Sequence, residues 1–193
     1  MSKVRLEAFS DAVIAIIITI MVLEMKVPAG SDWQALRSLA PVFLTYVMSY
    51  AYLGIYWNNH HHMLHAVDRI DGGVLWANLH LLFWLSLIPF VTGWMGENHV
   101  TPLPTAVYGL VLLMAAISYS FLQAVLQRAS AANSKLRVAV GRDLKGKASI
   151  GLYLAAILLA FVTPWLAVAI YVFVALMWLV PDPRIEAMFR SGK

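Results

Sequence analysis

Long apolar runs separated by short polar stretches fill almost the whole of this chain. A run of about twenty apolar residues is long enough to cross the hydrocarbon core of a bilayer as a helix. Spans are expected at about residues 8–25, 39–62, 73–95, 104–127, 147–162 and 163–181, with almost nothing left for a soluble domain. The pattern therefore predicts an all-α integral membrane protein, in which residues 1–193 form a single domain of six transmembrane helices.

Composition supports the same class. The 193 residues are 61% hydrophobic and only 12% charged, which lies outside the usual range of soluble domains. The chain has no cysteine, so disulfides, thiol catalysis and thiolate metal sites are excluded. The first span has no small-residue cleavage site and carries internal charge, so we expect a retained span and not a signal peptide.

Lysine and arginine are distributed unevenly between the connections. Twelve of the fourteen would lie on the side that carries both termini, and only Lys26 and Arg37 on the other. Because positive side chains accumulate on the cytoplasmic side, both termini are expected in the cytosol. The basic segment 128–147 is explained in the same way: its expected neighbours are lipid headgroups, and no nucleic acid is implied.

The first span begins with charged residues. The apolar run from Ala12 to Leu23 would cover only about 18 Å of a core roughly 30 Å thick. The helix must therefore extend back past Asp11, which places Ser10 and Asp11 at membrane depth, where polar groups mark function. The alternative is an interfacial start, in which these groups meet only headgroups.

A stripe of this helix combines apolar side chains with one hydroxyl. At 100° per residue, one face carries Arg5, Phe9, Ala12, Ile16, Thr19, Ile20 and Leu23. Ser10 and Asp11 lie on the flanks. Such a helix could line a narrow pore with its stripe and bind neighbouring helices through its flanks. Ordinary packing of isoleucines in a bundle core is the alternative.

Polar residues that could form hydrogen bonds with Ser10 and Asp11 lie where span two ends and span three begins. A buried hydrogen-bonded layer would hold the first helix at a fixed angle. The expected partners of Asp11 or Ser10 are His80 first, then Asn78 and Trp76, then Trp57 and His61.

The histidine cluster admits a second interpretation. His61 and His65 are four residues apart and His62 and His65 three, so one helix face could present two imidazoles to a metal, and Asp68 could add an oxygen. Solvated histidines at a helix end are the alternative, and whether His60 and its neighbours bind metal stays open. No hydrolytic triad or phosphate-binding loop is present, so we expect no enzyme.

The opposite end of the third span carries Pro89, which is expected to kink the helix. Glu97, with Glu24 near the end of the first span, would make the external mouth acidic.

The motif RxxxFSD, here Arg5, Phe9, Ser10 and Asp11, resembles the transmembrane protein 175 family of potassium channels, specifically its short bacterial branch. Residues 86–97 also resemble the third helix of that family. The resemblance implies a cation channel in a bacterial inner membrane that prefers potassium modestly over sodium, without a TVGYG filter, and that assembles as a homotetramer around its first helices. No cofactor is implied beyond potassium ions in the pore.

The resemblance also implies residue roles. Ile16 matches the main hydrophobic constriction, Thr19 a hydroxyl layer, and Ile20 and Leu23 further apolar layers. The packing network of the first helix would comprise Arg5, Phe9, Ser10, Asp11, Trp76, Asn78 and His80. Two alternatives stay open: a proton-coupled or metal-cation transporter that uses Asp11 and the histidines, and a membrane subunit without flux of its own.

Overall fold

Every regular element that the structure describes is an α helix. The computed structural model describes residues 2–67, 70–129 and 144–179. Its helices are, in chain order, α1 (Lys3–Leu23), α2 (Trp33–Ser38), α3 (Ala40–His65), α4 (Gly72–Ser86), α5 (Ile88–Glu97), α6 (Pro102–Ala129), α8 (Leu144–Leu159) and α9 (Pro164–Leu179). The all-α class expected from the hydrophobic pattern is confirmed.

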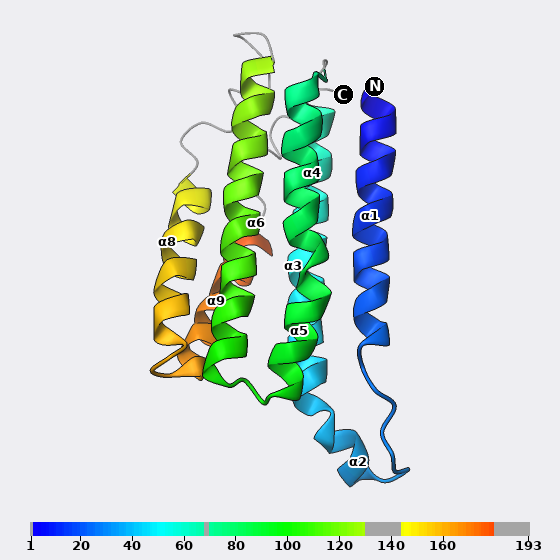
Figure 1. Cartoon of the computed structure of the whole chain (residues 1–193), viewed down its shortest axis with the longest axis vertical. Coiled ribbons are helices and arrows are strands. Elements are labelled where there is room, and N and C mark those ends of the chain that lie inside the picture. Colours follow the sequence, from blue (N-terminus) through cyan, green and yellow to red (C-terminus); the bar gives the residue numbers. More distant parts are fainter. Residues whose placement is uncertain (1, 68–69, 130–143, 180–193) are drawn as a thin grey trace.

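The helices form an elongated bundle with α1 at one side and α8 and α9 at the other (Figure 1). α1 packs against α3, α4 and α5, and α6 packs against α4, α5, α8 and α9. We call the end of the molecule at which α1 begins the upper end, and the end at which α1 finishes, near α2, the lower end, as drawn in Figure 1.

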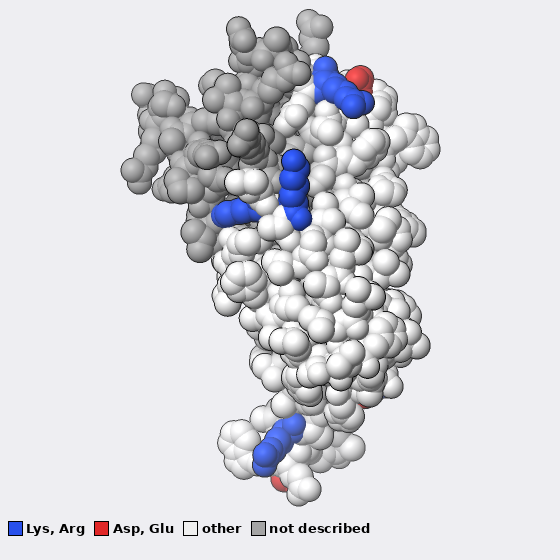
Figure 2. All heavy atoms as spheres, turned by 90° about the vertical axis from the view of Figure 1, so that its left-hand side faces the viewer, with Lys and Arg blue, Asp and Glu red and all other residues white. Residues whose placement is uncertain are grey.

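Several helices have the length and composition of membrane spans. Within the described ranges, Lys3–Leu23, Gly72–Glu97 and Pro102–Ala129 are each long and apolar enough to cross a bilayer, and Pro164–Leu179 is a shorter apolar helix. A side view shows lysine and arginine side chains in the upper part and at the lower tip, with an uncharged band between them (Figure 2). The division into six spans remains a prediction.

The third expected span is broken. α4 ends at Ser86 and α5 begins at Ile88, with Leu87 between them at φ −84° and ψ −13°. The Leu87 amide donates to Trp84 O, three residues back instead of four. Pro89 follows in the first turn of α5, where its missing N–H needs no partner. The interruption expected at Pro89 is thereby confirmed.

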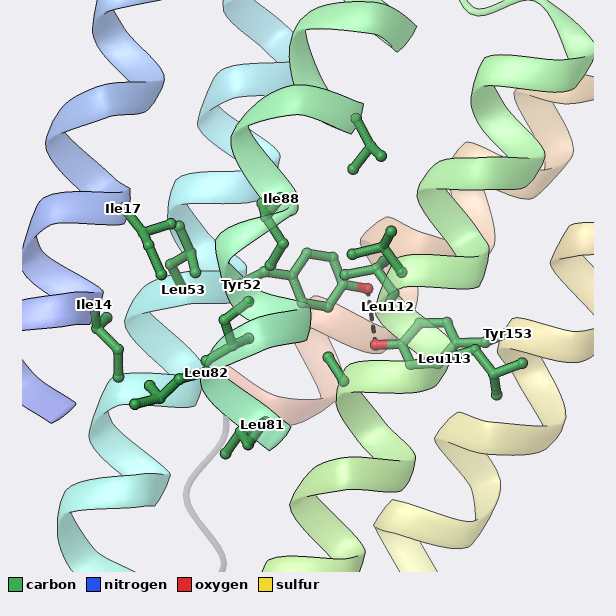
Figure 3. Packing of buried hydrophobic residues seen from close by; sticks show 14 of the residues in the cluster. Ile14, Ile17, Tyr52, Leu53, Leu81, Leu82, Ile88, Leu112, Leu113 and Tyr153 are labelled. Carbon is green, nitrogen blue, oxygen red and sulfur yellow. Dashed lines mark hydrogen bonds between the residues drawn. The ribbon is translucent and has the colours of Figure 1, made fainter. Parts of the chain in front are cut away.

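The core runs continuously from α1 to α8. Ile14 and Ile17 of α1 point toward Leu53 and Leu82, which lie on α3 and α4 (Figure 3). The core continues past α3 to Tyr153 on α8 (Figure 3). One face of α1 is therefore part of the bundle core.

A buried tyrosine cluster joins α3 and α6 to the last two helices. Tyr52 donates to the carbonyl oxygen of Tyr171 at 2.6 Å and accepts a bond from Tyr153 at 3.3 Å. Tyr108 and Ser49 share a hydrogen bond of 2.9 Å. These bonds fix α8 and α9 to the part of the bundle that contacts α1.

Candidate pore helix and its anchors

The stripe expected on α1 lies on an exposed face of the molecule. Ile16 is 56% exposed, Ile20 41% and Leu23 79%, and Thr19 is also exposed. The opposite face is buried and comprises Leu6, Ser10, Ile14, Ile17 and Met21. α1 therefore packs against the bundle with one face and leaves the stripe exposed on the other.

Thr19 needs no partner from another helix. Its hydroxyl lies 2.9 Å from Ile16 O and 3.1 Å from Ala15 O, so its proton is used within α1. The lone pairs of the oxygen remain on the exposed face. This arrangement presents an acceptor, and no donor, beside Ile16.

Ser10 is anchored through Asn78 to His60. The Asn78 side-chain amide donates to Ser10 Oγ at 2.9 Å, and Ser10 Oγ donates to Leu6 O at 2.8 Å. His60 Nε2 lies 2.6 Å from Asn78 Oδ1, which can only accept, so Nε2 carries the proton. Ser10, Asn78 and His60 are at most 1% exposed, so they form a buried polar anchor between α1, α4 and α3.

Asp11 and Lys3 add two contacts to α3 in the upper half of the molecule. Trp57 Nε1 donates to Asp11 Oδ1 at 3.0 Å, and Lys3 Nζ donates to the carbonyl oxygen of His65 at 2.8 Å. Together with Ser10, these contacts attach the upper half of α1 to two helices by specific hydrogen bonds.

The preference for His80 as the partner of Asp11 or Ser10 is wrong. His80 Nδ1 bonds Ser118 at 2.9 Å, and His80 Nε2 accepts from Trp84 at 3.3 Å. Trp76 is 76% exposed and does not face α1 either. The reason is helical phase: both residues lie two positions from Asn78, about 200° around α4. The partners are instead Asn78 for Ser10 and Trp57 for Asp11, which the sequence ranks second and third.

Two further motif residues lie on the exposed side of α1. Phe9 is 44% exposed, and Arg5 is exposed as well. A contact of Arg5 with α3 or α4, implied by the resemblance, is not found among the described residues. Arg5 lies five positions before the buried Ser10, about 140° away around the helix. It therefore belongs to the stripe.

A hollow of about 610 Å³ separates the lower half of α1 from α5. Its walls are mostly apolar, and its lining includes Ile16, Ile20, Pro89, Phe90 and Gly93. Glu24 and Glu97 also line it, the two carboxylates expected at the external mouth.

Lys26 pairs with one of these carboxylates. Its Nζ lies 2.7 Å from Glu97 Oε1, and the two side chains are 80% and 47% exposed. The hydrogen bond to Glu97 and the negative charge of that carboxylate raise the pKa of Lys26 above its ordinary value. Lys26 is therefore positively charged at neutral pH and offsets part of the negative charge of Glu24 and Glu97.

The histidines of α3 are arranged as a ring stack. The rings of His61 and His65 are 6.0 Å apart, and that of Trp57 lies 6.3 Å from His61. Over the described residues, no group of three or more histidine, aspartate or glutamate side chains is placed to hold a metal ion. Asp68, the possible oxygen ligand, lies outside the described residues.

Comparison with known proteins decides the family. A family model described as endosomal/lysosomal potassium channel TMEM175 matches residues 5–89. A protein of Chryseobacterium sp. (strain P1-3), named as a potassium channel, is 53% identical over 192 residues, covering 100% of both chains. This chain belongs to the TMEM175 family. TMEM175 proteins are ion channels, so the expectation that the chain is not an enzyme is confirmed.

Other TMEM175 proteins match over less of their length or at lower identity. A protein of Chamaesiphon minutus, named as a potassium channel, is 33% identical over 86% of this chain and 88% of its own. The crystal structure of a lysosomal potassium-selective channel TMEM175 homolog from Chamaesiphon minutus superposes with a TM-score of 0.75 at 31% identity, covering 92% of this chain and 96% of that one. A Danio rerio protein, named endosomal/lysosomal proton channel TMEM175, is 26% identical over 60% of this chain and 22% of its own.

Proposed function

We propose that the protein is a passive cation channel that conducts potassium in preference to sodium. The observation that carries the proposal is the division of α1 into two faces. One face is anchored by buried hydrogen bonds, and the other presents Ile16, Thr19, Ile20 and Leu23 outside the protomer. The potassium-channel names of the two bacterial relatives support the choice of ion.

The proposed pore lies on the symmetry axis of a homotetramer, with four copies of the stripe around it. In a lipid-facing helix, Arg5 and the Thr19 acceptor would be unfavourable at the surface, whereas a water-filled axis accepts both. The Ile16 ring would be the narrowest hydrophobic level, opened when the four helices separate and closed by dewetting when they converge.

Selectivity in this proposal comes from the constriction. A narrow ring of Ile16 side chains beside the Thr19 oxygen layer favours the ion that is cheaper to dehydrate, which is potassium. No ring of carbonyls replaces the hydration shell, so the preference over sodium is modest.

The proposed location is a bacterial inner membrane, with both termini in the cytosol. Twelve of the fourteen lysines and arginines lie on the terminal side of the six proposed spans. The upper end of the molecule is then cytosolic, and the hollow lined by Glu24 and Glu97 lies near the external mouth.

The test is the reversal potential of the purified protein in liposomes under opposed potassium and sodium gradients. The expected reversal lies on the potassium side. Ile16→Asn should wet the constriction, raise the conductance several-fold and move the reversal toward zero. Val22→Asn is the control: Val22 is 44% exposed but lies outside the stripe, roughly 120° from Ile16 around the helix, so the reversal potential of this variant should match that of the parent. An unchanged pore in Ile16→Asn would overturn the assignment of the constriction.

Two other functions are outcomes of the same experiment. The animal relative named as a proton channel makes proton conduction the second candidate, and a reversal that follows an imposed pH gradient would support it. Flux that saturates and requires a coupled proton gradient would instead indicate a transporter that uses Asp11 and the histidines. If the unmodified protein conducted no ions in liposomes, the result would contradict both the potassium-channel and the proton-channel proposals.

A further inference from the structure

The two ends of α1 are attached in different ways. In the upper half, Ser10 and Asp11 are held by Asn78 and Trp57, and Ser10 and Asn78 are fully buried. Beyond the lower end, the ion pair of Lys26 with Glu97 is largely exposed. A buried network is costly to disrupt, whereas an exposed ion pair is weak and screened by salt.

α5 offers a fixed surface beside the lower end of α1. Thr92 of α5 shares a hydrogen bond of 2.7 Å with Ser49 of α3. A Cβ added to Gly96 would lie 2.8 Å from the backbone of Val42, so the two helices already touch there. α5 cannot follow α1 without separating from α3.

The space for motion lies between these two helices. The hollow of about 610 Å³ extends from Val13 of α1 to Glu24, which follows the end of this helix, and on α5 it is lined by Phe90, Gly93 and Trp94. The hollow leaves room on this side of the lower half of α1, while Ile17 and Met21 on its other face stay packed in the core.

From these contacts we propose that α1 pivots about its buried upper anchor, and that the ion pair of Lys26 with Glu97 is a latch that retains its lower end beside α5. Lys26 and Glu97 are positioning residues for gating. This inference rests on the proposed channel function, because the moving helix is the one that carries the Ile16 ring. Exposed ion pairs shift such an equilibrium by about two- to five-fold per subunit at low salt.

The structure provides a site for locking the lower end. A Cβ on Gly93 would lie 3.9 Å from the Cβ of Glu24, close to the spacing in disulfides. The chain has no cysteine of its own, so Glu24→Cys with Gly93→Cys creates a unique pair. In liposomes, oxidation should drive the open probability of this variant to zero or to one, and a reductant should restore gating. Unchanged gating with the disulfide formed would overturn the pivot.

The latch has a test that does not depend on current. The rate of disulfide formation in membranes reports how often the two positions meet, and it can be read by thiol labelling. Adding Lys26→Gln or Glu97→Gln should slow the reaction about two- to five-fold, and the exchanged pair Lys26→Glu with Glu97→Lys should restore it. High salt should slow disulfide formation in the protein that keeps Lys26 and Glu97, and should leave the rate unchanged in the variant that also carries Lys26→Gln. Disulfide formation at the same rate with and without these substitutions would overturn the latch. If the rates change as expected but the parent protein conducts no ions, only the proposed channel function would be overturned.

Discussion

At the scale of single residues, Asn78 determines how α1 is attached. Its amide donates to Ser10 and its oxygen accepts from His60, so one side chain satisfies buried groups on two helices. The sequence indicated that Ser10 needs a partner in this layer, because a hydroxyl at membrane depth must be satisfied. It could not decide between Asn78 and His80, since the rotation of α4 about its own axis is set by tertiary packing.

Asn78→Leu should destabilise the protein by about 1–3 kcal/mol, because Ser10 and His60 would lose a buried partner at nearly constant volume. The measurement is thermal unfolding in a fixed detergent. Trp76→Leu is the control on the same helix: Trp76 is 76% exposed, so its stability should remain within about 0.5 kcal/mol of the parent. Equal unfolding temperatures of the Asn78→Leu and Trp76→Leu variants would contradict the stabilising role of the buried anchor.

At the scale of elements, the hydrophobic pattern of the sequence predicted the presence of the helices well. It predicted the residues at which they begin and end less well. α1 begins at Lys3, five residues before the expected start, and Lys3 and Glu7 face each other at 3.9 Å across one turn. The break at Pro89 was predictable because proline has no N–H to donate. The tyrosine cluster was not, because tyrosines in apolar helices do not show from sequence which neighbour they meet.

Gly109 tests how closely two of these elements approach. A Cβ at this position of α6 would overlap the hydroxyl of Tyr171 on α9, which donates to Thr105 O at 3.1 Å. Gly109→Ala should therefore lower stability by about 1–3 kcal/mol, and adding Tyr171→Phe should recover part of the loss.

Gly151→Ala is the matched control for Gly109. Nothing lies within 4 Å of a Cβ at Gly151 in α8, so alanine there should be neutral or stabilising by up to about 1 kcal/mol. Both variants are compared by thermal unfolding in the same detergent. A loss at Gly151 as large as that at Gly109 would contradict the packing explanation.

At the scale of the whole molecule, the protomer divides into a part that holds α1 and a part that does not. α3, α4 and α5 contact α1, whereas α8 and α9 lie at the opposite side. The sequence correctly placed the polar anchor of α1 at the adjoining ends of the second and third expected spans. It could not show that the stripe would be exposed on a single protomer, because a periodic apolar face fits a bundle core equally well.

Exposure of the stripe leads to a prediction about assembly. Native mass spectrometry from membranes should give four copies of the 21.4 kDa chain. Ile20→Cys, on the stripe, should form disulfides between subunits in membranes, because the stripes converge on one axis in the proposed tetramer. Phe173→Cys on α9, where Phe173 is 56% exposed, should not. The reverse result would place the subunit contacts on the other side of the molecule.

The direction of the first and last described helices has a consequence for evolution. α1 begins at the upper end, and α9 runs back from the lower end toward the upper end (Figure 1). In the proposed six-span topology, a second copy joined after the first would enter the membrane in the same orientation. Duplication and fusion of the gene would require no inversion of topology, and the linker would stay on one side of the bilayer.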